Sequence, residues 1–197
     1  MKKIFSIKNI TRISILGVLG AILMLIDFPI FIAPSFYKLD ISDLPCLIGA
    51  FAMGPIPGLF IQIIKILIKL LFKPTSTAFI GEIAAFIFSS SYCVSASLIY
   101  QHNKNKKGAI RAIVISSIIM VVVSSVSNYL FIIPAYCKLY KMPLEAIISL
   151  GSAIFPAVTN KLTFIVCCVV PFNIIKAIII STLTLLLYKH ISPLLKD

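Results

Sequence analysis

Long apolar runs, separated by short polar or proline-containing stretches, fill almost the whole chain. All of them reach the roughly 20 residues that an α-helix needs to cross a bilayer. They lack the alternation over about ten residues that is typical of an outer-membrane β-barrel. The pattern therefore predicts an all-α integral membrane protein with a single membrane domain, residues 1–197. The runs lie at about 10–33, 44–72, 78–100, 109–133, 144–170 and 171–190.

The second run contains a turn signal. Residues 54–58 read GPIPG, and two prolines and two glycines in five residues make a poor helix interior. We therefore expect two helices here, at about 44–54 and 57–73. The first is only ~17 Å long at 1.5 Å per residue, so it needs a tilt or a locally thin bilayer to cross.

Basic residues cluster at the ends of the apolar runs, which is the pattern that sets orientation in a membrane. The clusters lie in the N-terminal MKKIFSIKNITR, in the loop QHNKNKKGAIR and near the C-terminus. If all three are cytoplasmic, an even number of spans must lie on each side of the loop. Splitting the second run gives four spans before the loop. Two follow it if residues 134–170 form a long, partly helical outer segment that dips into or caps the protein.

The prediction is thus six transmembrane helices with both termini cytoplasmic and with Pro171 at the start of the last helix. The basic head leads directly into the first span without a small-residue cleavage site, so we expect no cleavable signal peptide. The spans are expected at about 10–30, 44–54, 57–73, 78–100, 109–133 and 171–190.

Composition agrees with a lipid-embedded protein of the cell membrane. The chain is 60% hydrophobic and 12% charged with a mean hydropathy of +1.10, whereas a soluble domain is about a quarter charged. The net charge of +12 has no accompanying basic–aromatic pattern, so we attribute it to orientation and expect no nucleic-acid partner. The five cysteines form no CxxC motif, which favours small apolar side chains over a metal site or a disulfide, and we expect no metal or cofactor.

Polar side chains from four separate segments converge at the predicted outer level. Polar groups inside a membrane are costly and usually face protein or water. The first outer loop adds aromatic residues, and aromatic walls with a few polar groups are typical of a small-molecule pocket. We therefore predict a ligand pocket near the outer face. The residues at this level include Tyr37, Asp40, Asp43, Glu82, Asn128, Asn173 and Lys176.

Several of these residues have a purely structural alternative. Asp43 could cap a helix, and Tyr37 could belong to an interfacial aromatic belt. Glu82 follows a glycine at a helix start, where a carboxylate is favourable without any ligand. Each asparagine could hydrogen-bond to a neighbouring helix.

Two helical faces suggest packing or docking. Lys65, Lys69 and Lys73 are four residues apart, and pairing with carboxylates or extension toward the membrane surface explains them better than ligand binding. Gly17 and Ala21 form a small-xxx-small pair that lets another helix approach closely. Packing within this protein and docking to a partner both fit that pair.

The chain offers little to an enzyme. The nucleotide-binding motif GxxxxGK[ST] and the hydrolase motifs HExxH and GxSxG do not occur, and no catalytic set joins the two histidines. A non-enzymatic role is therefore predicted. A small membrane enzyme such as a lipid transferase, and a purely structural subunit, are the alternatives.

The residues also carry a family resemblance. The chain resembles the substrate-binding S components of energy-coupling-factor (ECF) vitamin transporters, and specifically their riboflavin-specific member. The combination of LDxSDxP, NYxxxxPxY and PFNIIK in this order is specific, although Ala85 stands where relatives often carry asparagine. The similar stretches are 38–58, 63–72, 81–86, 128–136 and 171–196.

The resemblance implies a six-helix fold that holds riboflavin under the first outer loop. It further implies association with a transmembrane coupling subunit and two ATPase subunits, which Gly17 and Ala21 would contact. The same scaffold with another vitamin or a flavin nucleotide is the main alternative, because Lys176 could meet a phosphate. The ligand contacts that the resemblance implies are Leu39, Asp40, Glu82, Asn128, Asn173 and Lys176.

Overall fold

The protein is a bundle of helices with one minimal β-ribbon, and the computed structural model describes residues 6–34 and 36–191. The ribbon joins Phe28 to Leu39 and Pro29 to Lys38 in antiparallel register, within the loop that follows the first helix. Its strands are β1 (Phe28–Pro29) and β2 (Lys38–Leu39). The helices are α1 (Ile7–Leu25), α2 (Asp43–Met53), α3 (Pro55–Phe72), α4 (Ile80–His102), α5 (Lys106–Ser127), α6 (Ile133–Tyr140), α7 (Leu144–Ser152), α8 (Lys161–Phe164) and α9 (Val170–Ile191).

Five helical segments are long and apolar enough to cross a membrane. α2 is equally apolar but has only 11 residues. The core lies where α2, α4, α5 and α9 meet, and small residues there bring the backbones close. One example is the buried Ser97 of α4, whose hydroxyl donates to the carbonyl of Ala50 in α2. Buried core residues include Leu47, Ala50, Tyr92, Ala96, Ile113 and Ile180.

The break between α2 and α3 falls at Gly54. This residue has φ +108°, a backbone conformation that L side chains rarely adopt. Pro55 follows in the first turn of α3, where its missing N–H removes no helical hydrogen bond. The GPIPG stretch thus ends one helix and starts the next.

Pro134 and Pro171 do not begin new helices. α5 and α6 are joined by a π-helical turn, η1 (Asn128–Ile132), and α8 and α9 are joined by another, η2 (Ile165–Val169). Each π turn lies just before a proline, Pro134 or Pro171. The wider turn relieves the clash between a proline ring and the preceding carbonyl groups, so the helix continues.

The expected helix start at Pro171 is therefore wrong. The last continuous helical segment begins at Lys161, and the segment that starts at Lys106 runs to Tyr140 rather than ending near residue 133. Only residues 141–160, which contain α7, separate these two long segments. The neighbouring helices thus extend into the expected outer segment 134–170 from both sides and leave residues 141–160 as the connection.

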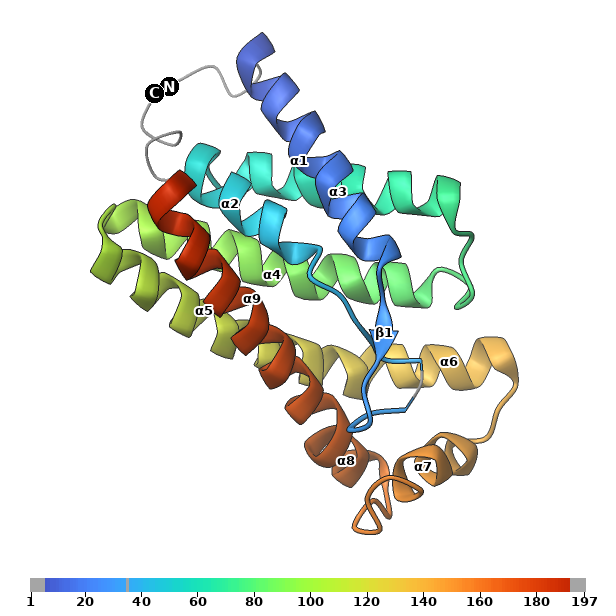
Figure 1. Cartoon of the computed structure of the whole chain (residues 1–197). Coiled ribbons are helices and arrows are strands. Elements are labelled where there is room, and N and C mark those ends of the chain that lie inside the picture. Colours follow the sequence, from blue (N-terminus) through green and yellow to red (C-terminus); the bar gives the residue numbers. More distant parts are fainter. Residues whose placement is uncertain (1–5, 35, 192–197) are drawn as a thin grey trace.

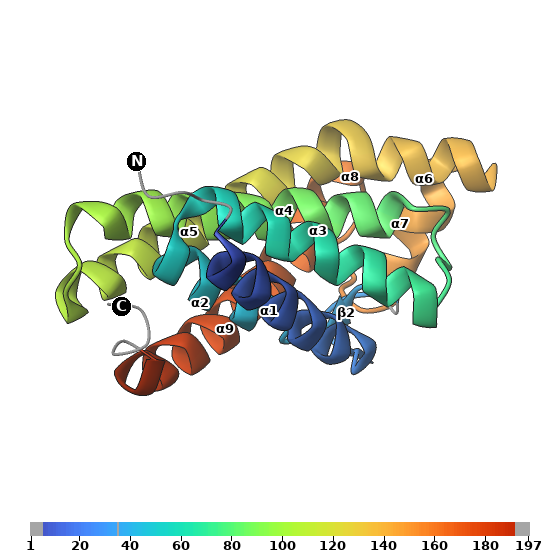
Figure 2. The same cartoon turned by 90° about the horizontal axis from the view of Figure 1, so that it is seen from above.

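Figures 1 and 2 show that the connections gather at two ends of the bundle. The α2–α3 break, the α4–α5 loop and the last turn of α9 lie at one end, called here the basic-loop end. The β-ribbon, the α3–α4 connection and α6–α8 lie at the other. The basic loop and the last helix end therefore share one end of the bundle. Of the basic residues used in the orientation argument, Lys2, Lys3 and Lys196 lie outside the described residues.

The small residues of α1 pack within the chain. Gly17 and Ala21 are both buried, and α1 lies along α3. A Cβ placed on Gly17 would lie 2.5 Å from Cγ2 of Ile64 in α3. Of the two interpretations of this pair, the structure shows internal packing, and neither residue is exposed for a partner.

Candidate ligand-binding site

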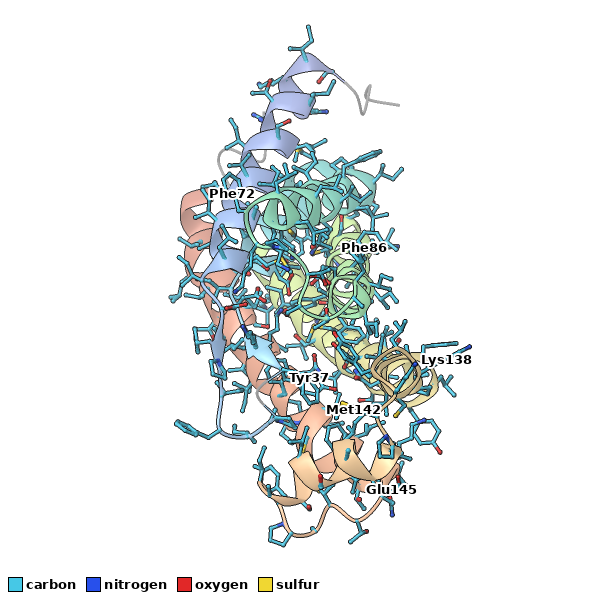
Figure 3. All side chains as sticks on the ribbon, turned by 90° about the vertical axis from the view of Figure 1, so that its right-hand side faces the viewer. Tyr37, Phe72, Phe86, Lys138, Met142 and Glu145 are labelled. Carbon is cyan, nitrogen blue, oxygen red and sulfur yellow. The ribbon has the colours of Figure 1, made fainter. Side chains whose placement is uncertain are left out.

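A cavity of about 470 Å³ is lined by elements at the end of the bundle opposite the basic loop. Its walls come from the β1–β2 loop, the end of α3, the start of α4, the α5–α6 junction, α7 and the middle of the last helical segment. Figure 3 shows Tyr37 and Met142 facing the space between the loop and α6, whereas Lys138 and Glu145 lie at the surface. This size falls in the range of ~300–1,000 Å³ that is usual for small-molecule sites.

One wall of the cavity is aromatic. The ring centroid of Tyr37 lies 4.8 Å from that of Phe36 and 5.4 Å from that of Phe172. Phe36 in turn contacts Tyr136 of α6, with 5.9 Å between the centroids. These rings come from the loop, from α9 and from α6, so the wall forms only when the three segments pack together. A flat apolar ligand could stack against such a surface.

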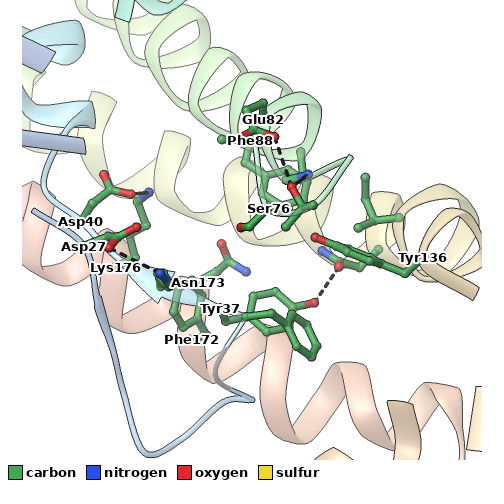
Figure 4. Close-up of a pocket in the computed structure, with 18 of the residues that line it drawn as sticks. Asp27, Tyr37, Asp40, Ser76, Glu82, Phe88, Tyr136, Phe172, Asn173 and Lys176 are labelled. Atoms are coloured by element: carbon green, nitrogen blue, oxygen red, sulfur yellow. Dashed lines mark hydrogen bonds and ion pairs between the residues drawn. The ribbon is translucent and has the colours of Figure 1, made fainter. Parts of the chain in front are cut away.

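The Tyr37 hydroxyl ties the loop to the α5–α6 junction. It donates a hydrogen bond of 2.7 Å to Oδ1 of Asn128 (Figure 4). Burial raises the pKa of the Tyr37 phenol well above its ordinary value, so the hydroxyl keeps its proton. The loop is thereby held over the cavity by a donor that does not ionise at physiological pH.

Asn128 and Asn173 are each held by a hydrogen bond from the side-chain amide to a backbone carbonyl. Nδ2 of Asn128 donates to the carbonyl of Ser124 at 2.8 Å, and Nδ2 of Asn173 donates to the carbonyl of Val169 at 2.9 Å. Each bond spans four residues and lies at a π turn. An amide nitrogen carries two hydrogens, so each side chain retains a donor for a ligand. Asn128 and Asn173 are both buried and both line the cavity.

Lys176 lies in a buried ion-pair network. Its Nζ is 3.1 Å from Oδ2 of Asp43 and 3.4 Å from Oδ2 of Asp40. Asp43 is 1% exposed, and its other oxygen accepts from Lys65 at 2.8 Å and from Ser89. Two ammonium and two carboxylate groups therefore balance one another at the cavity wall, where Asp40, Asp43 and Lys176 line the cavity and Lys65 lies behind Asp43.

A second ion pair joins α3 to α4. Nζ of Lys69 lies 2.6 Å from Oε1 of Glu82, and both side chains are largely buried. The hydroxyls of Thr75 and Thr77 donate to Oε2 of Glu82 at 2.9 and 3.1 Å. The α3–α4 connection thus folds back to satisfy the carboxylate that opens α4.

A third pair lies closer to the surface. Lys73, at the end of α3, donates to both oxygens of Asp27 at 2.9 Å, and Lys38 lies 3.6 Å from the same carboxylate. Lys65 and Lys69 of α3, and Lys73 directly after it, thus each pair with an acidic residue. The pairing interpretation of this face is confirmed.

Six of the seven predicted ligand contacts line this one cavity: Tyr37, Asp40, Glu82, Asn128, Asn173 and Lys176. Leu39 does not. It is buried against Ala33 and Phe172. Side chains alternate along an extended chain, so Lys38 and Asp40 face the cavity while Leu39 points away.

Some lining residues were not predicted as ligand contacts. Asp43 was open to interpretation as a helix cap, but α2 begins at this residue and its side chain serves the ion-pair network instead. Lys69 and Lys73 were expected to pair with carboxylates or to extend toward the membrane surface, yet both also line the cavity. The sequence feature that could have identified these residues is the small number of acidic residues. The chain has six of them, and four line this cavity.

The arrangement suits binding rather than chemistry. Apolar and aromatic walls surround amide donors and paired charges, which is the composition of a small-molecule binding site. Among the described residues, no group of three or more His, Cys, Asp or Glu side chains is placed to hold a metal ion.

Comparison with known proteins gives one consistent result. A model of the family described as the substrate-specific component of ECF transporters matches residues 8–188. The chain is 31% identical over 189 residues to the riboflavin transporter RibU of Staphylococcus aureus, covering 96% of this chain and 93% of that protein. It is 25% identical over 188 residues to the riboflavin transporter FmnP of Bacillus subtilis, covering 95% and 93%.

A solved structure agrees with this match. The fold superposes on an S component of a bacterial ECF transporter with a TM-score of 0.74 and 32% sequence identity, over 96% of this chain and 98% of that one. With a family model that covers nearly the whole sequence, these similarities identify the family directly. The chain belongs to the substrate-specific components of ECF transporters.

Proposed function

We propose that this chain binds riboflavin in the described cavity and serves as the substrate-binding subunit of an ATP-driven ECF uptake transporter. The observation that carries the proposal is the near-full-length similarity to proteins named as riboflavin transporters. The cavity supports it, because six residues that this family resemblance or the polar pattern singled out surround one space.

The chemistry of the cavity matches the ligand. The flavin ring system is flat and apolar on its faces, and the wall of Phe36, Tyr37 and Phe172 offers stacking surfaces. The ring edge and the ribityl hydroxyls need hydrogen-bond partners. Asn128, Asn173 and Lys176 would supply them, and a ligand that left these buried groups unpaired would bind less well.

We further propose six spans, cytoplasmic termini and a cavity that opens near the outer face. The short α2 would complete the count of six beside the five long segments. The end of α9 lies with the basic α4–α5 loop, and the positive-inside rule favours the cytoplasm for that end. The partners would be a transmembrane coupling subunit and two ATPase subunits, within the lipid of the cell membrane.

Isothermal titration of the purified protein with riboflavin, flavin mononucleotide and thiamine tests the ligand. We expect tight riboflavin binding, no thiamine binding and a yellow preparation that releases flavin on denaturation. A colourless protein that binds no flavin and turns over a lipid would instead support an enzyme. A preparation that binds none of the three compounds would contradict the proposal.

The double variant Asn173→Ala/Lys176→Ala tests whether riboflavin binds in this cavity. Each side chain should contribute a hydrogen bond worth about 1–3 kcal/mol, so riboflavin affinity should fall by at least about tenfold. The control is Asn103→Ala/Lys104→Ala, which removes the same residue types from the exposed basic-loop end. Equal riboflavin affinity of the cavity variant and the parent would refute this placement.

A further inference from the structure

The cavity is formally neutral although the protein is strongly basic. Among the residues that the structure describes, four lysines and four carboxylates line it. The chain as a whole carries a net charge of +12. Charge has therefore been balanced locally around the ligand space. The lining charges are Lys38, Lys69, Lys73, Lys176, Asp27, Asp40, Asp43 and Glu82.

Each of these lysines already has an acidic partner. The Nζ–O distances are 2.6 Å for Lys69–Glu82, 2.9 Å for Lys73–Asp27, 3.1 Å for Lys176–Asp43 and 3.6 Å for Lys38–Asp27. A ligand anion would have to displace one of these carboxylates or lie beside it.

Burial makes it harder for a ligand anion to compete with the carboxylates of the two inner ion pairs, Lys69–Glu82 and Lys176–Asp43. The side chains of Lys69 and Glu82 are 11% and 7% exposed, and those of Lys176 and Asp43 are 14% and 1% exposed. Solvent screens such buried groups poorly, so a displaced carboxylate would still repel a ligand anion strongly. The outer pairs that involve Asp27 are more accessible to solvent.

We infer that this balance makes the cavity selective for an uncharged flavin over its phosphate ester, with Glu82 and Asp27 as specificity-determining groups. This inference rests on the proposed riboflavin function and narrows its ligand class. A phosphate monoester carries a charge of about −1.5 to −2 at pH 7 and would enter a space whose four lysines are each already paired with a carboxylate. Glu82 and Asp27 occupy the lysines that would otherwise receive it.

The test compares dissociation constants for riboflavin and flavin mononucleotide by titration, in the parent and in two variants. The parent should bind riboflavin at least about tenfold more tightly than the phosphate ester. Glu82→Gln releases Lys69, and Asp27→Asn releases Lys73 and Lys38. In both variants the ratio of the two constants should fall by roughly tenfold toward unity.

The matched control is Glu145→Gln, the same change at an exposed position of α7 (Figure 3), which should leave the ratio at the parent value. If Glu82→Gln does not fold because Lys69 is left buried alone, Asp27→Asn carries the test, since its carboxylate is partly solvated. A parent that binds both flavins equally, or variants that bind with the parent ratio, would overturn the inference while leaving riboflavin binding intact. A parent that binds neither flavin would instead overturn the proposed function.

Discussion

Asp43 is the residue on which the charged part of the site depends. It is almost fully buried, and it contacts Lys65 of α3, Ser89 of α4 and Lys176 of α9. A buried carboxylate is tolerated only when opposite charge and donors surround it. One side chain thus links three helices and positions the ammonium group of Lys176 at the cavity.

This dependence predicts a non-additive pair of substitutions. Lys65→Met keeps the aliphatic packing but leaves Asp43 short of a cation, and Asp43→Asn leaves Lys65 short of an anion. Each should lower the free energy of unfolding by about 3–5 kcal/mol, because an uncompensated charge stays buried. The double variant should lose less than the sum of the two, because the remaining Asp40 and Lys176 still balance.

Thermal unfolding in detergent, followed in all three variants, provides the measurement. Lys107→Met, at an exposed position, is the control and should match the parent. A double variant whose loss equals the sum of the single losses would show that Lys65 and Asp43 act independently.

At the scale of the element, α1 and α3 show how closely two helices can approach when one side is small. The buried Gly17 lies against Ile64, and Gly20 lies against the aliphatic part of Lys65. The α1–α3 contact therefore depends on residues that contribute almost no side-chain volume.

We expect Gly17→Leu to separate these helices. Overpacking of a tight contact costs about 1–3 kcal/mol, so the unfolding temperature should fall. Val18→Leu adds apolar volume to the same helix at an exposed position and should have little effect. If the two variants were equally stable, α1 would not pack on α3 as described.

The helices also show what the sequence could and could not reveal. Gly54 and Pro55 combine a residue that tolerates positive φ with one that starts helices, so the α2–α3 break follows from residue types alone. Pro171 carried the same kind of signal, yet the helix continues through it. A π turn absorbs the proline, and such a turn depends on packing that no local pattern records.

The residues of the cavity also divide into those that the sequence could predict and those that it could not. Asn128, Asn173 and Lys176 could be predicted because a polar side chain inside an apolar run needs a partner. The exclusion of Leu39 depends on the exact alternation of an extended segment, and the partners of the α3 lysines depend on which acidic residue the fold brings near. The orientation of Leu39 and the partners of these lysines both depend on contacts between separate segments, so no single stretch of sequence predicts them.

At the scale of the whole molecule, the two ends of the bundle should face opposite sides of the membrane. We expect Lys104→Cys to be shielded from a membrane-impermeant maleimide in intact cells and Lys141→Cys to react. Both changes are made in a variant whose five native cysteines are replaced by alanine, because Cys137 and Cys167 are partly exposed. Modification of both positions, or of Lys104→Cys alone, would refute the proposed orientation.

The neutral cavity has a consequence for the surroundings of the protein. Removing the four lysines and four carboxylates of the cavity from the chain's 18 basic and 6 acidic residues leaves 14 basic and 2 acidic ones. The net positive charge of the chain therefore comes from residues outside the cavity lining, among them the exposed Lys104, Lys106 and Lys107 around the α4–α5 loop. Such exposed basic residues attract anionic phospholipid headgroups. The lining of the cavity thus carries no formal net charge, while we expect the exposed basic residues to concentrate anionic lipid around the protein.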